Sequence, residues 1–365
     1  MPIRNLSALI LALYVSVVPA QTLKPVVVAK GLEHPWGLAF LPEGRMLVTE
    51  RQGRMRIVER DGRLGPPLTG LPAVAASGQG GLLDVALHPK FSDNRLVYWS
   101  FSEAGDGGAG TAVARGRLDG QRLADVQVIF RQQPKVGGGN HFGSRLVFAP
   151  DGRLFVTLGD RFHRKDDAQD LGNHLGKIVR IEDDGRVPTD NPFANRAGAK
   201  PEIWSYGHRN VQGAALNPAT GELWAHEHGP QGGDELNVPA AGANHGWPVI
   251  THGRNYGIGT KIGEGTERAD VAAPLRVWQP TSIAPSGMAF LTGDRYPGWK
   301  GNLFVGALRG QHVVRFEFDG RKVLREERLL VDFAQRIRDV RQGPDGWLYV
   351  LTDSPDGQIA RLEPR

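Results

Sequence analysis

The sequence predicts an all-β protein built as a six-bladed β-propeller. Its strand signals are short, β-branched and aromatic, and glycine (49 residues) and proline (25 residues) separate them. No long stretch carries the 3.6-residue apolar period of a helix. One strand–turn–strand phrase also recurs along the chain, roughly 45–75 residues apart, which is typical of a repeat fold. The six copies cover residues 37–50, 84–101, 145–160, 213–229, 287–308 and 339–353.

A repeat of this length fits one propeller blade. A single four-stranded blade cannot bury both of its faces, whereas six arranged radially cover one another and leave only short edges. We therefore expect residues 21–365 to form one propeller domain. The wider spacings in the middle of the chain predict large loops there, and loops on a rigid scaffold commonly carry function.

Residues 1–20 are interpreted as a secretory signal peptide. Arg4 precedes an apolar run at residues 6–18, and a small-residue cleavage signal ends at Ala20. The run is too short to span a membrane, and a buried first helix is the alternative. The chain has no cysteine, so it has neither a disulfide nor a lipidated cysteine. In a bacterium, export by a signal peptide without a lipid anchor predicts a periplasmic location.

The composition argues against several functional classes. The formal net charge of +5 is dispersed and predicts no nucleic-acid footprint. Without cysteine a thiol nucleophile is excluded, and neither a G-x-S-x-G elbow nor an H-E-x-x-H helix occurs. The stretch GDGGAG at residues 105–110 matches a dinucleotide fingerprint, but a strand and a turn follow it instead of a helix. We interpret it as a hairpin loop.

Residues 226–237, HEHGPQGGDELN, gather the residue types of a metal site. His226 and His228 lie two apart on a strand and so face one side, but the third close ligand that zinc needs is not evident. The glycine-rich loop offers backbone carbonyls and the carboxylates of Asp234 and Glu235, and such hard oxygens suit calcium. Calcium is the favoured interpretation; an acidic surface turn with structural histidines and a zinc site are the alternatives.

Two further features indicate chemistry. His141 follows three glycines and precedes a strand, so it is a candidate general base, with a structural histidine as the alternative. Four arginines lie at matching places in the repeats and could together bind a small polyanion, because guanidinium groups match carboxylates bidentately. Four unrelated surface arginines are the alternative. These arginines are Arg209, Arg309, Arg336 and Arg338.

Taken together, these motifs resemble the soluble aldose sugar dehydrogenases that depend on pyrroloquinoline quinone and are related to soluble glucose dehydrogenase. The resemblance covers about residues 32–361, and the order and spacing of the motifs make it specific. The motifs are HPWGLAFLPEGRMLVTER, GQGGLLDVALHP, NHFGSRLVFAPDG, LGKIVRI, SYGHRNVQG, EHGPQGGDELN, APSGMAF and RIRDV.

The resemblance implies a six-bladed propeller with the quinone over the central axis. It implies that His141 takes the proton of the sugar's C1 hydroxyl and that Arg209 stabilises charge on the quinone oxygen. Calcium would act as a Lewis acid at the quinone. The positions that fall where the family holds the cofactor are Gln79, Asn210, Tyr256, Ala307, Leu308, Arg309, Arg336, Ile337 and Arg338.

Two calcium positions are implied as well. The carbonyls of Gly229 and Pro230 correspond to ligands of the quinone-bound calcium, and a second calcium would use Glu235 and the region of His245. The chain departs from the family in having His245 where relatives often have tyrosine, and Arg309 where they often have lysine.

The implied function is oxidation of the C1 hydroxyl of aldoses to lactones, with an external electron acceptor as the second partner and a monomer or weak homodimer as the assembly. Two other classes fit the residues less well. A calcium-dependent propeller hydrolase of the lactonase type would use the same fold and metal but no arginine ring. A non-catalytic propeller would bind a carbohydrate or a protein.

Overall fold

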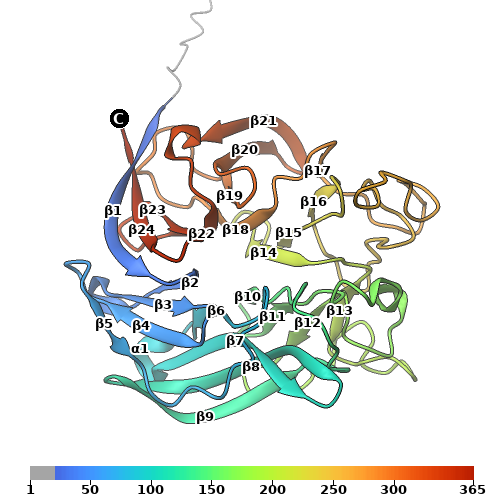
Figure 1. Ribbon diagram of the computed structural model, residues 1–365, viewed down its shortest axis with the longest axis horizontal. Helices are drawn as coiled ribbons and strands as arrows, with labels where there is room; N and C mark the ends of the chain where they lie inside the picture. The colour runs from blue at the N-terminus through green and yellow to red at the C-terminus, as the bar shows by residue number, and fades with distance from the viewer. Residues whose placement is uncertain (1–20) are drawn as a thin grey trace, which may run out of the picture.

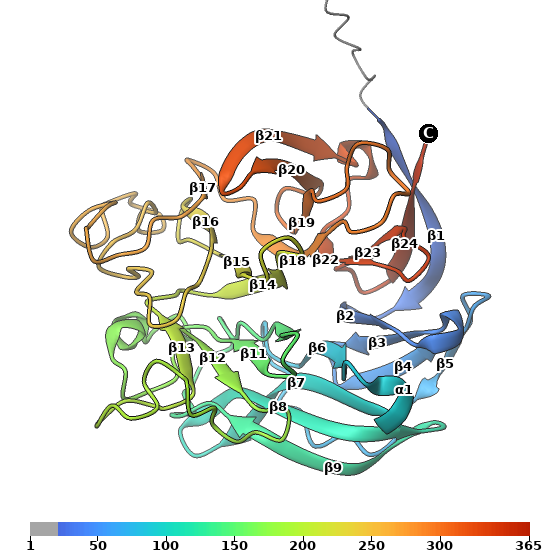
Figure 2. The same ribbon diagram turned by 180° about the vertical axis from the view of Figure 1, so that it is seen from behind.

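The computed structural model describes residues 21–365, which form six four-stranded antiparallel sheets arranged radially around one axis (Figures 1 and 2). The predicted all-β, six-bladed propeller is thereby confirmed. The predicted signal peptide, residues 1–20, lies outside the described residues. None of the helices within residues 21–365 has the length and apolarity that a bilayer crossing requires.

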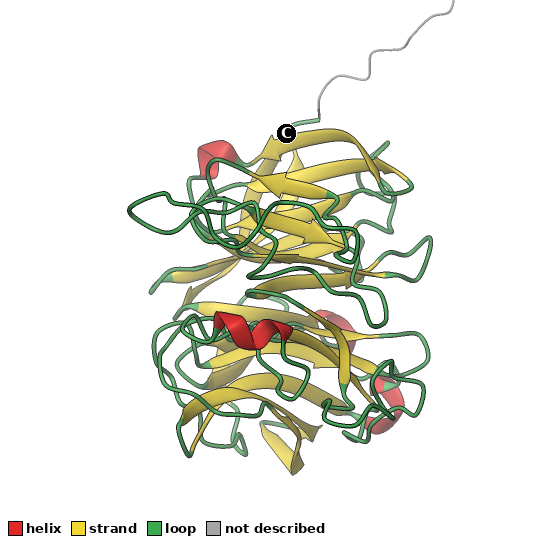
Figure 3. Ribbon diagram, turned by 90° about the vertical axis from the view of Figure 1, so that its right-hand side faces the viewer, coloured by secondary structure: helices red, strands yellow, loops and turns green. Residues whose placement is uncertain are grey.

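Each sheet is one blade, with its first strand nearest the axis and its fourth at the rim. Short helices lie only in the connections of the described chain (Figure 3). Blade 1 contains β2 (Pro35–Phe40), β3 (Met46–Glu50), β4 (Arg54–Val58) and β5 (Leu64–Pro67); blade 2 contains β6 (Leu82–Leu87), β7 (Leu96–Gly105), β8 (Gly108–Asp119) and β9 (Arg122–Arg131); blade 3 contains β10 (Leu146–Phe148), β11 (Leu154–Thr157), β12 (Lys177–Ile181) and β13 (Ile203–Tyr206). Blade 4 contains β14 (Val211–Leu216), β15 (Leu223–Glu227), β16 (Asp234–Asn237) and β17 (Arg276–Trp278); blade 5 contains β18 (Pro285–Phe290), β19 (Leu303–Ala307), β20 (Val313–Asp319) and β21 (Lys322–Leu329); blade 6 contains β22 (Ile337–Gln342), β23 (Leu348–Thr352), β24 (Gly357–Pro364) and β1 (Leu23–Leu32). The helices are α1 (Phe91–Asn94), η1 (Pro42–Gly44), η2 (Lys165–Gln169) and η3 (Val331–Phe333).

Blade 6 joins the two ends of the described chain. Its rim strand is β1, which pairs with β24 from Leu23 opposite Pro364 to Leu32 opposite Gly357. Figure 1 shows β1, in blue, lying against the red strands of this blade. The repeat phrase did not indicate this pairing, because β1 lies outside all six copies.

A cluster of buried charges fills the axis. Arg145 Nη1 donates to Asp84 Oδ1 and to Asp339 Oδ1, both at 3.0 Å. Arg341 donates to the same carboxylates at 2.7 and 2.8 Å. Two arginines from blades 3 and 6 thus neutralise two aspartates from blades 2 and 6; Arg145 and both aspartates are buried, while the Arg341 side chain is 23% exposed.

These charges explain why two of the six repeats begin with glycine. The first residues of the six copies are Gly37, Asp84, Arg145, Gly213, Gly287 and Asp339. A Cβ added to Gly287 would lie 2.0 Å from Asp339 Oδ1, and one added to Gly37 would lie 2.9 Å from Asp84 Oδ1. Glycine is therefore required where the side chain of the next blade occupies the axis.

Hydroxyl groups connect neighbouring blades just outside this cluster. Thr157 Oγ1 accepts the N–H of Arg145 and donates to the carbonyl of Val211 in the next blade, both at 2.9 Å. Ser100 acts in the same way between blades 2 and 3, and Thr49 between blades 1 and 2. These repeated bonds set the spacing of the inner strands.

Two long connections lie on one side of the molecule. Residues 238–275 join β16 to β17, and residues 182–202 join β12 to β13. Figure 1 shows the first of them extending beyond the rim of blade 4. The large loops predicted for the middle of the chain are therefore present.

We expect Arg145→Met to lower the free energy of unfolding by roughly 3–5 kcal/mol, because two buried carboxylates would keep a single cation between them. Arg153→Met in the same blade is the control, since that side chain is 26% exposed and pairs with surface carboxylates. It should change the stability much less. Urea unfolding followed by tryptophan fluorescence measures both, and equal losses would contradict the importance of the axial charges.

Candidate active site at the end of the central channel

A cavity of about 240 Å³ lies on the axis, at the end where the innermost strands begin. Every blade contributes to its wall, so the ring of blades positions the whole site. The contributing residues from or just before the innermost strands are Trp36, Leu83, Phe142, Gln212, Ala284 and Arg338. Below it, the Gln212 carbonyl accepts a hydrogen bond from Arg145 Nε at 3.2 Å, which joins the cavity floor to the axial charges.

The cavity wall carries more positive than negative charge. Arg51, Arg336 and Arg338 line it, and Asp353 is the one acidic lining residue within the described chain. Asp353 Oδ2 accepts from Arg336 at 3.1 Å and from Arg338 at 3.0 Å. Burial alone would raise the pKa of Asp353, but the charges of these arginines and a bond with His34 hold it below its ordinary value. A net charge of about +2 is left for a ligand.

His141 lies at the edge of this cavity in a left-handed backbone conformation, with φ of 56°. Its N–H donates to Gln79 Oε1 at 2.8 Å, and its ring Nδ1 lies 2.6 Å from Asp160 Oδ1. Because Asp160 is a carboxylate that only accepts, Nδ1 carries the hydrogen and the lone pair is on Nε2. Nε2 makes no hydrogen bond to any residue within the range 21–365.

The surroundings keep this imidazole uncharged. The side chain is 5% exposed, and burial lowers the pKa of His141 below its ordinary value. The bond to Asp160 opposes this effect, while the charges of Arg209 and Arg161 add to it. His141 is therefore a neutral imidazole that can accept a proton on Nε2, and it lies next to Gln79 and Phe142 of the cavity wall.

Asp160 connects several parts of the site. In addition to His141, its carboxylate accepts from the N–H of Phe162 at 2.7 Å and from Trp247 Nε1 at 2.8 Å. Its own N–H donates to the carbonyl of Arg209 at 2.8 Å. Burial would raise the pKa of Asp160, but the bond to His141 and the charge of Arg209 lower it.

Arg209 is 4% exposed and points its guanidinium toward the glycine-rich loop. Nη1 donates to the carbonyls of His228 at 2.9 Å and Gly229 at 2.7 Å, and Nη2 donates to the Tyr256 hydroxyl at 3.2 Å. These two loop carbonyls therefore accept from the Arg209 side chain and not from another strand.

The two histidines of residues 226–237 lie on one side of the chain, as their spacing predicts, and that side faces blade 5. His228 Nε2 donates to the Pro285 carbonyl at 2.7 Å, and His226 Nε2 lies against Gly213. Burial lowers the pKa of His228 to about 3 and that of His226 well below its ordinary value. Both rings pack between the blades in the neutral form, away from the loop's oxygens.

The sequence made Asp234 a candidate calcium ligand, but its carboxylate oxygens already accept hydrogen bonds from other residues. It accepts from the N–H groups of Gly229 (2.9 Å), Ile283 (2.9 Å) and Ala284 (3.0 Å) and from Ser282 Oγ (2.7 Å). The carboxylate therefore ties the glycine-rich loop to the start of blade 5.

The remaining donors near this loop are backbone oxygens. The Pro230 carbonyl is buried and accepts no hydrogen bond from residues 21–365. The carbonyl of Gly229, already bonded to Arg209, keeps a second lone pair. Within the described chain, no three His, Asp or Glu side chains gather as a metal cluster, so a cation here would depend on carbonyls.

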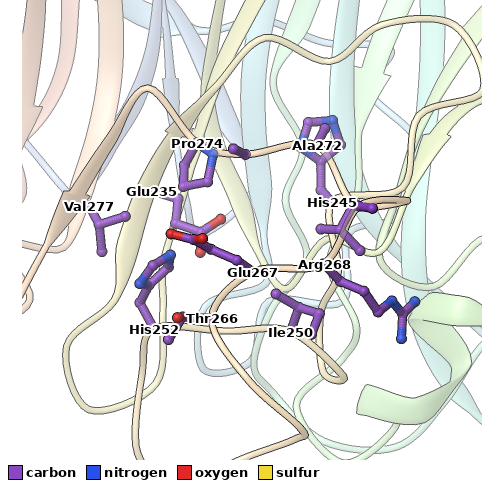
Figure 4. A pocket seen from close by; sticks show the side chains of 13 residues that line it. Glu235, His245, Ile250, His252, Thr266, Glu267, Arg268, Ala272, Pro274 and Val277 are labelled. Atoms are coloured by element: carbon purple, nitrogen blue, oxygen red, sulfur yellow. The ribbon is translucent and has the colours of Figure 1, made fainter.

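Glu235 and His245 lie apart from the axial cavity, in the wall of a second cavity of about 550 Å³ under residues 238–275. Figure 4 shows the carboxylates of Glu235 and Glu267 directed toward each other, with His252 nearby. Neither ring nitrogen of His245 has a hydrogen-bond partner within the described chain, and the ring stacks on His208 at 4.5 Å between centres.

Glu235 is an unusually placed carboxyl group. Burial raises its pKa well above the ordinary value, and the charge of Glu227 on the neighbouring strand β15 acts in the same direction. Asn237 Nδ2 donates to both carboxylates, at 3.2 and 3.3 Å, while its Oδ1 finds no partner among residues 21–365. Two buried carboxyls and an unused amide oxygen form an acceptor-rich position.

The residues predicted to hold a cofactor divide into three groups. Gln79, Leu308, Arg336 and Arg338 line the axial cavity. Asn210 lies just behind it, buried, with its Nδ2 lacking any partner in the described chain, and Tyr256 lies over Arg209. Outside the cavity wall are Ala307 and Ile337, which pack in the core between blades, and Arg309, which is exposed.

Sequence reasoning missed Trp36, Arg51, Asp160, Trp247 and Asp353. A signal for the two aspartates was available. Asp160 and Asp353 each end a copy of the repeat phrase, and both lie at the end of the axis where His141 and Arg338 also lie. The two tryptophans and Arg51 follow no pattern that distinguishes them from core or surface residues.

Residues 32–361 match the family model described as glucose/sorbosone dehydrogenase. The chain is 49% identical over 340 residues to the aldose sugar dehydrogenase YliI of Escherichia coli (strain K12), covering 92% of this chain and 91% of that protein. The apo-form structure of the soluble aldose sugar dehydrogenase from Escherichia coli is 48% identical with a TM-score of 0.91, covering 94% of this chain and 100% of that chain. The PQQ-bound aldose sugar dehydrogenase from Streptomyces coelicolor is 30% identical with a TM-score of 0.79, covering 94% and 98%. The match over nearly the whole propeller means that this chain belongs to the glucose/sorbosone dehydrogenase family.

Proposed function

We propose that the protein oxidises the C1 hydroxyl of aldose sugars to lactones, with pyrroloquinoline quinone (PQQ) as cofactor and calcium as Lewis acid. The observation that carries this proposal is the adjacency of two unlike sites. An arginine-lined cavity lies on the axis, and the His141–Asp160 pair lies at its edge. Relatives at 49% and 30% identity are named aldose sugar dehydrogenases, which supports a sugar substrate.

The axial cavity suits this quinone, which carries three carboxylates. Arg51, Arg336 and Arg338 would bind them, and two buried donors, Arg338 Nε and Asn210 Nδ2, lack partners within residues 21–365. A ligand rich in carboxylate and carbonyl oxygens would satisfy these donors. When bound, the quinone supplies the two-electron acceptor for the hydride that leaves C1 of the sugar.

Both predicted calcium positions have suitable donors. Near the cavity these are the carbonyls of Gly229 and Pro230, and at the second position they are Glu235 and its neighbour Glu227, close to His245. A cation at Glu235 would also relieve the repulsion between two buried carboxylates. Calcium at the first position supplies Lewis acidity next to the quinone.

The protein's own groups would manage the proton and the charge. Nε2 of His141 would accept the proton of the C1 hydroxyl, while Asp160 holds Nδ1–H and stabilises the imidazolium that forms. As the C1–H bond breaks with both of its electrons, the C1–O bond becomes the lactone carbonyl. The Arg209 guanidinium would stabilise the negative charge that develops beside it.

The proposal includes an external electron acceptor, which must remove two electrons in each cycle. The features of residues 1–20 support a periplasmic location. A monomer or weak homodimer is the proposed assembly.

The arginine surplus favours this function over a calcium-dependent lactonase or a carbohydrate-binding propeller, since neither requires a polyanion site on the axis.

We expect the purified protein, supplied with quinone, calcium and glucose, to reduce an artificial dye. Excess chelator should abolish the activity, and calcium but not zinc should restore it, because carbonyl and carboxylate oxygens favour calcium. No dye reduction with any aldose would refute the proposed function. Full activity with the metal demonstrably absent would refute the calcium assignment alone.

Arg336→Ala should weaken quinone binding about ten- to a hundredfold, because it removes a charge-assisted hydrogen bond worth roughly 1.5–3 kcal/mol. Arg321→Ala is the matched control, since that surface arginine also pairs with a carboxylate, Glu222, far from the cavity. Quinone fluorescence titration gives both dissociation constants. The cavity assignment fails if Arg336→Ala binds quinone as tightly as the parent does.

His141→Asn should reduce turnover by about 10²–10⁴ while quinone and calcium stay bound. Asparagine is chosen because it tolerates the left-handed backbone at this position. Rapid-mixing spectroscopy should place the loss in the sugar-dependent half-reaction. In the parent, burial lowers the pKa of His141, so activity should persist at pH 6.5 and fall only at more acidic pH, as the imidazole gains a proton. An acidic limb centred above the ordinary histidine pKa would contradict this assignment.

A further inference from the structure

Trp247 belongs to the long connection at residues 238–275, yet its side chain is 7% exposed and reaches into the site. Its backbone is held at both ends. The N–H donates to the Gly207 carbonyl at 2.9 Å, and its carbonyl accepts from Gln169 Nε2 at 2.8 Å. The indole packs against Ala168 and Ile262. The ring therefore has a defined position although it is carried by a loop.

The indole contacts Asp160, which is the partner of His141, and it also contacts Arg209. Nε1–H donates to Asp160 Oδ2 at 2.8 Å, while the other oxygen of this carboxylate binds His141 Nδ1 at 2.6 Å. The face of the ring lies under Arg209, with 5.3 Å from its guanidinium carbon to the ring centre. Within residues 21–365, Trp247 is the one side chain that both donates to the Asp160 carboxylate and packs its ring against the Arg209 guanidinium.

We propose that Trp247 is a positioning residue that keeps the His141–Asp160 pair and the Arg209 guanidinium in one arrangement, through its indole N–H on Asp160 and its ring face under Arg209. The inference rests on the proposed function for the roles of His141 and Arg209. The two oxygens of Asp160 are divided between the proton acceptor and the indole, so rotation of the carboxylate would break both bonds together.

The physical consequence concerns the basicity of His141. The indole N–H stabilises negative charge on Asp160, so less of that charge is available to stabilise an imidazolium. The charged and titratable groups that face His141 are Asp160, Arg209, Arg161 and His228. Removing the N–H leaves all of them in place and strengthens the effect of Asp160, which should make His141 more basic.

Trp247→Phe tests this, because it removes the N–H and keeps an aromatic face for Arg209. In the apoprotein, we expect histidine NMR to show the pKa of His141 rising by about 0.5–1 unit. With quinone and calcium bound, the acidic limb of kcat/KM should move to higher pH by the same amount, and turnover should fall about fivefold. Quinone affinity should stay within twofold of the parent.

Trp278→Phe is the matched control. That indole is 4% exposed, and its Nε1 also donates to a carboxylate, Glu326, at 3.3 Å, but at the outer strand of blade 4. It should leave the pKa of His141 and the pH profile unchanged. If Trp247→Phe does not move that pKa, or if both variants move it equally, the positioning role is refuted.

A measurement on the parent protein does not depend on how well a variant folds. The indole N–H resonance of Trp247 should shift with pH at the pKa of His141, because Asp160 connects the two rings. An indole resonance that ignores this titration would refute the proposal. If the titrations agree with the proposal but the parent oxidises no aldose, the positioning arrangement stands and the proposed function fails.

Discussion

The two arginines and two aspartates on the axis are the constraint on which the rest of the molecule depends. Arg145 and Arg341 neutralise Asp84 and Asp339 where three blades converge, and no one of these charges can leave without exposing another to a low-polarity interior. Together with the hydroxyl groups that join neighbouring blades, this cluster fixes how closely the inner strands approach. Because Arg145 also binds the carbonyl of Gln212, the floor of the cavity is defined by the same cluster.

Above this floor, a positively charged cavity and a neutral histidine, His141, lie close together. In the proposed function, the excess of guanidinium groups in the cavity receives an anion, and the histidine at its edge stays neutral so that it can accept a proton. The two requirements support each other, since burial and the nearby charge of Arg209 lower the pKa of His141. In the proposed reaction, Asp160 would provide the compensation, because it is the partner of the imidazolium that forms when His141 accepts the proton.

Much of this could be predicted from the sequence. The repeat phrase predicted six blades and large loops in the middle of the chain, and the glycines next to His141 and the paired Arg336 and Arg338 indicated the site. Pairings between remote segments could not be predicted, as with Trp247 and Asp160, because loop conformation decides them. Ile337 illustrates strand alternation: it lies between two cavity arginines and therefore points into the core.

The closure of blade 6 has a consequence for the order of folding. Leu23 lies opposite Pro364, so the rim strand of this blade comes from the start of the described residues and its partner from their end. The hairpins of the other blades need only local contacts, whereas β1 has an unpaired edge until β24 has been made. Closing the ring therefore needs contacts of large sequence separation, and the axial charges, which need blades 2, 3 and 6 together, cannot all be in place until β22 has docked beside blades 2 and 3.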